Sequence, residues 1–207
     1  MQKLDLKKIM KEAFSASVKK VSFVEIPEMP FLMVEGKGYP ENNLSYQQSF
    51  EVLYGVAYTL KFMLKFNENI RPENYSDYVI PPLGTQWWMA EGDFDVNKPD
   101  LWCWNNLLMQ PGFITPELIE IAKSEFRKKK NEVSTDRLKF EKFYEGKVAQ
   151  MMHVGPYSEA GMVAKQIIAE IESKGHKVCG RHHEIYFNDP RKTLPEKLKT
   201  LIRIPYR

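Results

Sequence analysis

Cysteine and long apolar runs are scarce in this sequence. Its 207 residues include only two cysteines, Cys103 and Cys179, which are far apart and belong to no CxxC or zinc-ligand spacing. We expect a pair of reduced thiols, as in cytosolic proteins, with a disulfide as the alternative. No apolar run approaches the about 18 residues of a membrane span, and residues 1–8 lack the apolar core of a signal peptide. The sequence therefore predicts an intracellular, cytoplasmic protein without a membrane partner.

The net charge is small, and the common phosphate-binding and metal-binding motifs are missing from the sequence. The formal net charge is +3, too small for the electrostatic surface of a nucleic-acid-binding protein. The basic run at 127–130 ends a predicted helix, where it complements the helix dipole. His182 and His183 are adjacent in a predicted strand, so they point to opposite faces and we expect no metal site. No glycine-rich phosphate loop, serine elbow or paired-carboxylate motif is found, and we expect no cofactor.

Aromatic residues are abundant. Tryptophan, tyrosine and phenylalanine make up 13% of the chain, and hydrophobic residues make up 43%. This composition is typical of a folded protein and excludes most disordered chains. At about 100–200 residues per domain, the length allows one large domain or two small fused ones.

Apolar periodicity and turn residues divide the chain into helices and strands. The expected helices are 4–14, 49–66, 116–130 and 158–174, and the expected strands are 18–26, 31–36, 78–89, 101–109, 138–144, 147–154, 181–187 and 198–204. The strand at 78–89 contains Pro81 and Pro82, so we expect it to be bent or to lie at a sheet edge. A tight turn at Glu145-Gly146 joins the strands at 138–144 and 147–154.

The order of these elements repeats. Each half has two strands, a glycine and proline break, a helix and two more strands, with the breaks at 36–40 and 155–157. Such a repeat predicts two small α+β units rather than one irregular fold. We place the pseudo-repeats at about 18–112 and 137–207 of a single domain 1–207, with a connecting helix near 116–130. Each repeat is small for an independent core, so we expect helices to cover one side and a ligand cleft at the junction.

All four tryptophans lie between positions 87 and 104. Trp87 and Trp88 are on one predicted strand, and Trp102 and Trp104 are on the next. Residues two apart share a face of a strand, so Trp102 and Trp104 lie together with one of Trp87 and Trp88. Three indoles would form a flat wall for a planar or cationic ligand. Ordinary core packing is the alternative, because large aromatic side chains dominate protein interiors.

Glu184 is the candidate acid–base residue. It alternates with His182 and Tyr186 on one face of the predicted strand 181–187, and a carboxylate in the middle of a strand is disfavoured. In a dry aromatic cleft it would act as a general base or as the counter-charge of a cation. The alternative is a solvent-facing position with a cross-strand lysine or arginine. Tyr157 and Tyr186 are phenols able to donate a proton or a hydrogen bond, and Tyr157 has a structural role at the Gly155-Pro156 turn as its alternative.

Several segments resemble one known family, the stand-alone GyrI-like proteins of the gyrase-inhibitor-like small-molecule-binding superfamily. The most specific segment is the block 182–193 with its continuation 195–200. Further segments of the same kind are 87–88, 102–104, 110–117 and 150–157. The resemblance spans nearly the whole chain.

The resemblance implies a fold and a site. The family fold is a tandem pair of strand–helix–strand–strand modules with pseudo-two-fold symmetry, an antiparallel sheet with helices on one side, and a central ligand cleft. The same fold forms the effector-binding domain of multidrug-responsive regulators, where a glutamate at the position of Glu184 meets cationic aromatic drugs. One subfamily hydrolyses cyclopropanoid DNA-alkylating compounds in an aromatic cage, which the tryptophans resemble. This sequence departs from the regulators in having no helix-turn-helix segment, and from the family in having Asn105 and Asn106 after Trp104.

Three functions follow as hypotheses. The first is a cyclopropanoid hydrolase with catalytic Glu184 and Tyr157 and with ligand-binding Trp87, Trp88, Trp102, Trp104 and Tyr186. The second is a non-catalytic protein that sequesters drugs in the same pocket, with Glu184 as counter-charge. The third is a module that interacts with gyrase. In the first two, the partner is a small planar, lipophilic or cationic xenobiotic rather than a nucleic acid, and the chain acts as a monomer or homodimer.

Overall fold

The computed structural model describes residues 3–92 and 94–207. Met1 and Gln2, which belong to the predicted domain 1–207 and to the segment judged for a signal peptide, lie outside the described residues. The chain forms two compact units. Of the described residues, the first unit contains 3–6, 29–81, 89–92 and 94–143, and the second unit contains 7–28, 82–88 and 144–207.

The second unit is built on an antiparallel sheet. Its strands are β1 (Ser22–Ile26), β6 (Gly146–Val154), β7 (His182–Tyr186), β8 (Lys199–Pro205) and β3 (Gly84–Met89), the last residue of which belongs to a first-unit segment. They are arranged in the order β1-β6-β8-β7-β3. The helices are α1 (Leu6–Ile9), which begins at the last residue of a first-unit segment, α2 (Lys11–Phe14) and α5 (Ala160–Ser173), and short 3-10 turns occur at Tyr157–Glu159 and Pro195–Lys197.

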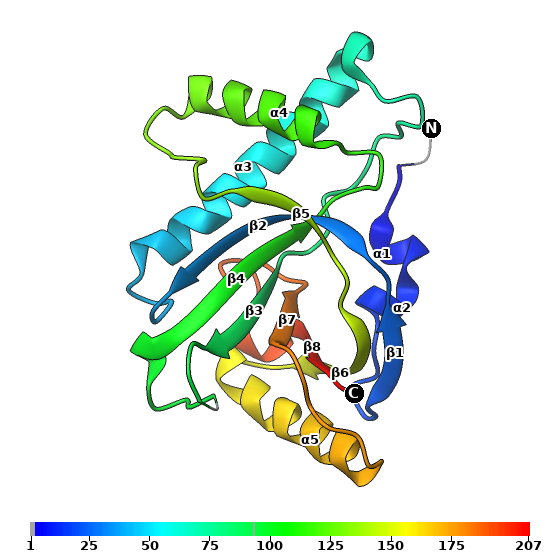
Figure 1. The fold of residues 1–207 in the computed structure, drawn as a ribbon, viewed down its shortest axis with the longest axis vertical. Helices are drawn as coiled ribbons and strands as arrows, with labels where there is room; N and C mark the ends of the chain where they lie inside the picture. The colour runs from blue at the N-terminus through cyan, green and yellow to red at the C-terminus, as the bar shows by residue number, and fades with distance from the viewer. Residues whose placement is uncertain (1–2, 93) are drawn as a thin grey trace. The chain divides into compact units, whose positions relative to one another are not determined.

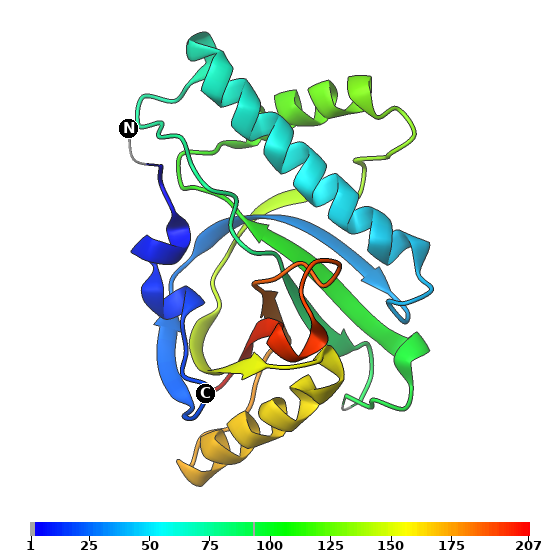
Figure 2. The ribbon, with the colours of Figure 1, turned by 180° about the vertical axis from the view of Figure 1, so that it is seen from behind.

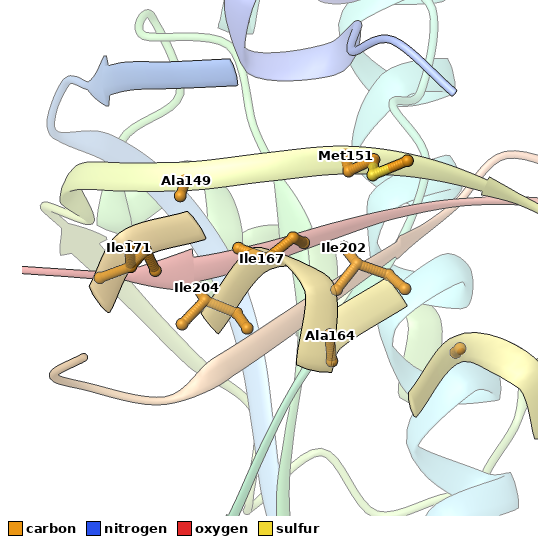
Figure 3. Close-up of a cluster of buried hydrophobic side chains, with 8 residues drawn as sticks. Ala149, Met151, Ala164, Ile167, Ile171, Ile202 and Ile204 are labelled. Atoms are coloured by element: carbon orange, nitrogen blue, oxygen red, sulfur yellow. The ribbon is translucent and has the colours of Figure 1, made fainter. Parts of the chain in front are cut away.

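Helix α5 packs on the sheet of the second unit through one apolar stripe. Ala160, Ala164, Ile167 and Ile171 recur at helical spacing and are buried. They form one buried cluster with alternate residues of β6 and β8, and Figure 3 shows Ile167 and Ile171 on the helix with Ile202 and Ile204 of β8 close by. Because the sheet contributes one face and the helix one stripe, the unit has a single apolar core.

The first unit has the same kind of construction. Its strands β2 (Met29–Lys37), β4 (Trp102–Met109) and β5 (Lys139–Phe143) pair antiparallel in the order β4-β2-β5. Helix α3 (Leu44–Phe66) packs on β2 and β4, and α4 (Pro116–Lys129) crosses α3, as Figures 1 and 2 show from opposite sides. The crossing is close because Gly55 has no side chain where the Phe126 ring lies. Short 3-10 turns occur at Glu68–Ile70 and Pro99–Leu101.

Strand pairing repeats between the two halves of the chain. Strand β2 pairs with β4 in the first unit, as β6 pairs with β8 in the second. The first strand of each half is exchanged: β1 pairs with β6, and β5 pairs with β2. The α+β class, the antiparallel pairing and the repeated strand–helix–strand–strand order are therefore confirmed. The compact units nevertheless take segments from both predicted repeats, and the cleft at the junction stays a prediction.

Three expectations about elements were wrong. The helix at 4–14 is two short helices, because Met10 has φ −102° and ψ 59°, outside the helical region. The strand at 78–89 begins only at Gly84, after Pro81 and Pro82, which have no N–H to donate to a ladder. The turn at Glu145-Gly146 makes no hairpin, since β5 and β6 pair with strands of different units.

Candidate functional site

Strand β7 positions the candidate site in the second unit. It pairs with β3 on one side and with β8 on the other, so its backbone is held along both edges. Its exposure alternates: His182, Glu184 and Tyr186 are partly exposed, and His183 and Ile185 are buried. The predicted division of this strand into two faces is confirmed. The cross-strand neighbours of Glu184 are Thr85 and Ile202, neither of which carries a charge.

The Glu184 carboxylate is held by side chains of its own strand. The Tyr186 hydroxyl donates to Oε2 over 3.0 Å, and the Trp87 indole N–H donates to the Tyr186 hydroxyl oxygen over 3.3 Å. His182 Nε2 lies 3.1 Å from Oε1. The Glu184 side chain is only 15% exposed and that of His182 is 25% exposed. The arrangement fixes the orientation of a carboxylate beside two aromatic rings.

Tyr157 is brought to this group by a glycine-dependent turn. Gly155 has φ +147°, which favours glycine, and Tyr157 follows Pro156 at the start of the 3-10 turn. The rings of Tyr157 and Tyr186 are 5.4 Å apart and nearly perpendicular, at 71°. Burial, together with the negative charges of Glu184 and Asp189, raises the pKa of the Tyr157 phenol. The raised pKa keeps the Tyr157 phenol protonated at neutral pH.

A buried ionic network supports the other face of β7. His183 Nδ1 lies 2.8 Å from Glu145 Oε1, and Arg203 Nη1 donates to Glu145 Oε2 over 2.5 Å. Arg203 also donates to the Gln150 side chain and to the carbonyl of Ala13 in α2. Burial would raise the pKa of Glu145, but the charges of Arg203 and His183 outweigh it and lower that pKa to about 2. The network ties β6, β7, β8 and α2 together behind the candidate site.

Trp88 lies in the second unit beside Trp87 but has a different partner. The guanidinium of Arg181 stacks over its ring, 3.5 Å from the centroid. This face of the partly exposed indole already holds a cation, as expected for an aromatic ring near arginine. Trp87 and Trp88 thus have separate partners, the Tyr186 hydroxyl and the Arg181 guanidinium.

Trp102 and Trp104 belong to the first unit. Trp104 is fully buried, with its ring 5.0 Å from that of Tyr46 and filling the space beside Gly36. This is the core packing that the sequence left as the alternative. Trp102 donates from its indole nitrogen to the Asp95 carbonyl over 2.9 Å, and its ring lies 5.1 Å from that of Phe94. A ligand-binding role for either tryptophan stays a prediction.

Other features bear on the remaining expectations. Cys103 and Cys179 are free. Among the residues that the structure describes, no group of three histidine, cysteine, aspartate or glutamate side chains is arranged to hold a metal ion. No helix within residues 3–92 and 94–207 combines the length and the apolar composition needed to cross a bilayer.

Sequence reasoning did not assign His182 to the site, although it placed His182 on the same face as Glu184. The spacing of two residues in a strand was a sufficient signal for that contact. The network of Glu145, His183 and Arg203 had no comparable signal, since its members are 38 and 58 residues apart in the chain.

Several known proteins are similar to this chain in sequence and fold. The family model of the GyrI-like small molecule binding domain matches residues 116–207. An uncharacterized conserved protein from Listeria innocua is 42% identical over 99% of this chain and 100% of its own, with a TM-score of 0.92. A hydrolase from Listeria innocua is 44% identical over the full length of both chains, with a TM-score of 0.89. The EcmrR C-terminal domain shares the fold at 12% identity, 91% coverage of this chain, 97% of its own and a TM-score of 0.56. No curated protein matches the chain.

An antiparallel α+β fold of repeated strand–helix–strand–strand order, with a carboxylate set among aromatic rings, defines a small-molecule-binding domain. The chain belongs to the GyrI-like family.

Proposed function

We propose that this protein hydrolyses small, planar, hydrophobic molecules, and specifically the strained ring of cyclopropanoid alkylating compounds. The observation that carries the proposal is the Glu184 carboxylate, which is 15% exposed, accepts a hydrogen bond from the Tyr186 hydroxyl and lies 3.1 Å from His182 Nε2. The similarity to a Listeria innocua hydrolase over the full length supports an enzymatic rather than a purely binding role.

The chemistry assigns one step to each group. Glu184 takes a proton from a water molecule while the water oxygen forms a bond to a cyclopropane carbon. The carbon–carbon bond of the cyclopropane breaks, and its electron pair moves into the conjugated ring system of the substrate. The negative charge is then carried by an oxygen of that system, which becomes a phenolate. Tyr157, kept protonated by burial and by Glu184, donates a hydrogen bond to that oxygen. The net change is the addition of one water molecule.

Replacement of Glu184 tests the proposal. Glu184→Gln keeps the size and one oxygen of the side chain but cannot accept the proton of water. We expect kcat for a cyclopropanoid substrate to fall by about 10²–10⁴-fold, the usual contribution of a general base, with little change in the Kd of the ring-opened product. Product formation is followed by mass spectrometry.

Glu172→Gln is the matched control. It makes the same chemical change at an exposed position on α5, away from β7. Wild-type turnover by Glu184→Gln would show that the assigned role is wrong.

A second candidate function is the sequestration of lipophilic cations without turnover. The stacking of Arg181 on Trp88 supports it, because an indole face that holds a guanidinium also suits an organic cation. Titration with tetraphenylphosphonium separates the two functions. Binding that weakens in Trp88→Leu, with no product from any cyclopropanoid substrate, favours sequestration; turnover by the wild type favours hydrolysis.

A further inference from the structure

We propose that His182 is the proton outlet of Glu184, a role that rests on the proposed hydrolase function. A general base that takes a proton from water in each cycle must lose it before the next one. Of the two oxygens of Glu184, Oε2 receives the Tyr186 hydroxyl, whose own oxygen receives the Trp87 N–H. Oε1 lies 3.1 Å from His182 Nε2. The proton therefore leaves from Oε1.

The surroundings of His182 suit release to solvent. Its side chain is 25% exposed, whereas the Glu184 side chain is 15% exposed. His183 provides the internal contrast: it is the same residue type on the same strand, but it is 3% exposed and its Nδ1 is held by Glu145. Of these two histidines, His182 is the one that combines contact with Glu184 and exposure to water.

The charged and titratable groups around His182 come from three elements. On its own strand they are Glu184 and Tyr186, and the residue before the strand is Arg181, which stacks on Trp88 of β3. Across β3 its register partner is Trp87, which has no titratable group. Tyr157 contacts Tyr186 from the 3-10 turn after β6. Glu184 is thus the direct ionisable partner of the imidazole.

The proton balance of the cycle is closed by this pair. After the attack, the Glu184 carboxyl group donates its proton to Nε2 of a neutral His182 that carries its own proton on Nδ1, which restores the carboxylate and forms an imidazolium. The imidazolium then gives its proton to a buffer base. The phenolate product takes one proton from solvent, so the cycle consumes one water molecule and no net proton.

Chemical rescue tests the role of His182. His182→Ala and His182→Gln are assayed with a cyclopropanoid substrate at low buffer concentration and with added imidazole. We expect a fast first turnover followed by a steady-state kcat at least about tenfold below that of the wild type, for both variants. Added imidazole should restore kcat in His182→Ala, because it replaces the missing proton acceptor. The Kd of the ring-opened product should not change.

The outcomes separate the possible failures. If the wild type forms no product, the proposed hydrolase function is wrong and this inference falls with it. If the wild type turns over and His182→Gln is as active, His182 only orients Glu184 through a hydrogen bond. If His182→Ala is slow and ignores imidazole, the proton leaves by another path. Glu184→Gln is the control that imidazole should not rescue.

Discussion

The His183 ring lies directly against Gly84, on the buried side of β7. A Cβ atom at position 84 would overlap with His183 Nε2 and lie 3.0 Å from the Glu184 carbonyl oxygen. The ring cannot turn away without breaking its contact with Glu145. Glycine is thus required at this position to let β3 approach β7, rather than for an unusual backbone angle.

We predict that Gly84→Ala lowers the free energy of unfolding by about 1–3 kcal/mol, the usual cost of adding a methyl group to a packed interior. Chemical denaturation measures the change. The control is Gly161→Ala in α5, where an added Cβ meets nothing within 4 Å and should stabilise the helix by up to about 1 kcal/mol. Equal stability of the two variants would contradict the packing role of Gly84.

Aromatic residues, which make up 13% of the sequence, have different roles at different positions. Trp104 fills the core of the first unit, and Tyr186 orients Glu184 in the second. On α3, Tyr58, Phe62 and Phe66 form a row of rings 6.1–6.2 Å apart that is largely exposed. The abundance of aromatic residues therefore does not locate the candidate site. The contacts of each ring distinguish a core residue such as Trp104 from Tyr186, which contacts Glu184.

At the scale of elements, the second unit depends on the ionic network that joins β6, β7 and β8. Glu145 precedes β6, His183 is in β7, and Arg203 is its cross-strand partner in β8. All three side chains are nearly inaccessible to solvent. A buried charge without its partner is costly, so the three residues stabilise the unit as a set rather than in pairs.

The network predicts loss of stability in acid. The pKa of Glu145 is lowered from 4.5 to about 2 in the folded protein, so its contribution is complete above about pH 4.5 and is lost as the pH falls toward 2. Glu145→Gln should lower the free energy of unfolding by about 3 kcal/mol at pH 7. It should also make that free energy depend less on pH between 4.5 and 2.

Urea denaturation over this pH range measures both effects. Glu125→Gln on α4, whose carboxylate forms an exposed pair with Lys128, is the matched control and should change the stability by less than about 1 kcal/mol. A pH dependence of Glu145→Gln equal to that of the wild type would exclude the carboxylate as its source.

At the scale of the whole molecule, the exchange of first strands makes each unit discontinuous in the chain. The second unit needs β1 on the outer edge of β6 and β3 on the outer edge of β7, and both come from the first half of the sequence. Without them, two sheet edges and part of the apolar core would meet water.

We predict that residues 137–207, the second pseudo-repeat, do not fold when expressed alone. The fragment contains α5 and the strands β5, β6, β7 and β8, but it lacks β1 and β3. Its NMR amide spectrum should be poorly dispersed and its thermal unfolding should not be cooperative. The full chain is the control, and a well-dispersed spectrum of the fragment would show that the repeat folds independently.

Periodic features of the sequence predicted much of the second unit. The alternation in β7 placed His182, Glu184 and Tyr186 on one face, and the apolar stripe of α5 was found at Ala160, Ala164, Ile167 and Ile171. These predictions succeeded because strand and helix periods are local properties of the chain. The helix at 4–14 failed at Met10, whose backbone leaves the helical region and divides the segment into two short helices.

The amino-acid sequence by itself determined the repeated order of elements, the family resemblance and the face of β7 that carries the carboxylate. Tertiary structure decided which strands pair, which tryptophan is in a core and which groups hold Glu184 and Glu145. The reason is physical. Periodicity acts over a few residues, whereas the partners of a buried charge or an edge strand are selected by packing between segments that are far apart in the chain.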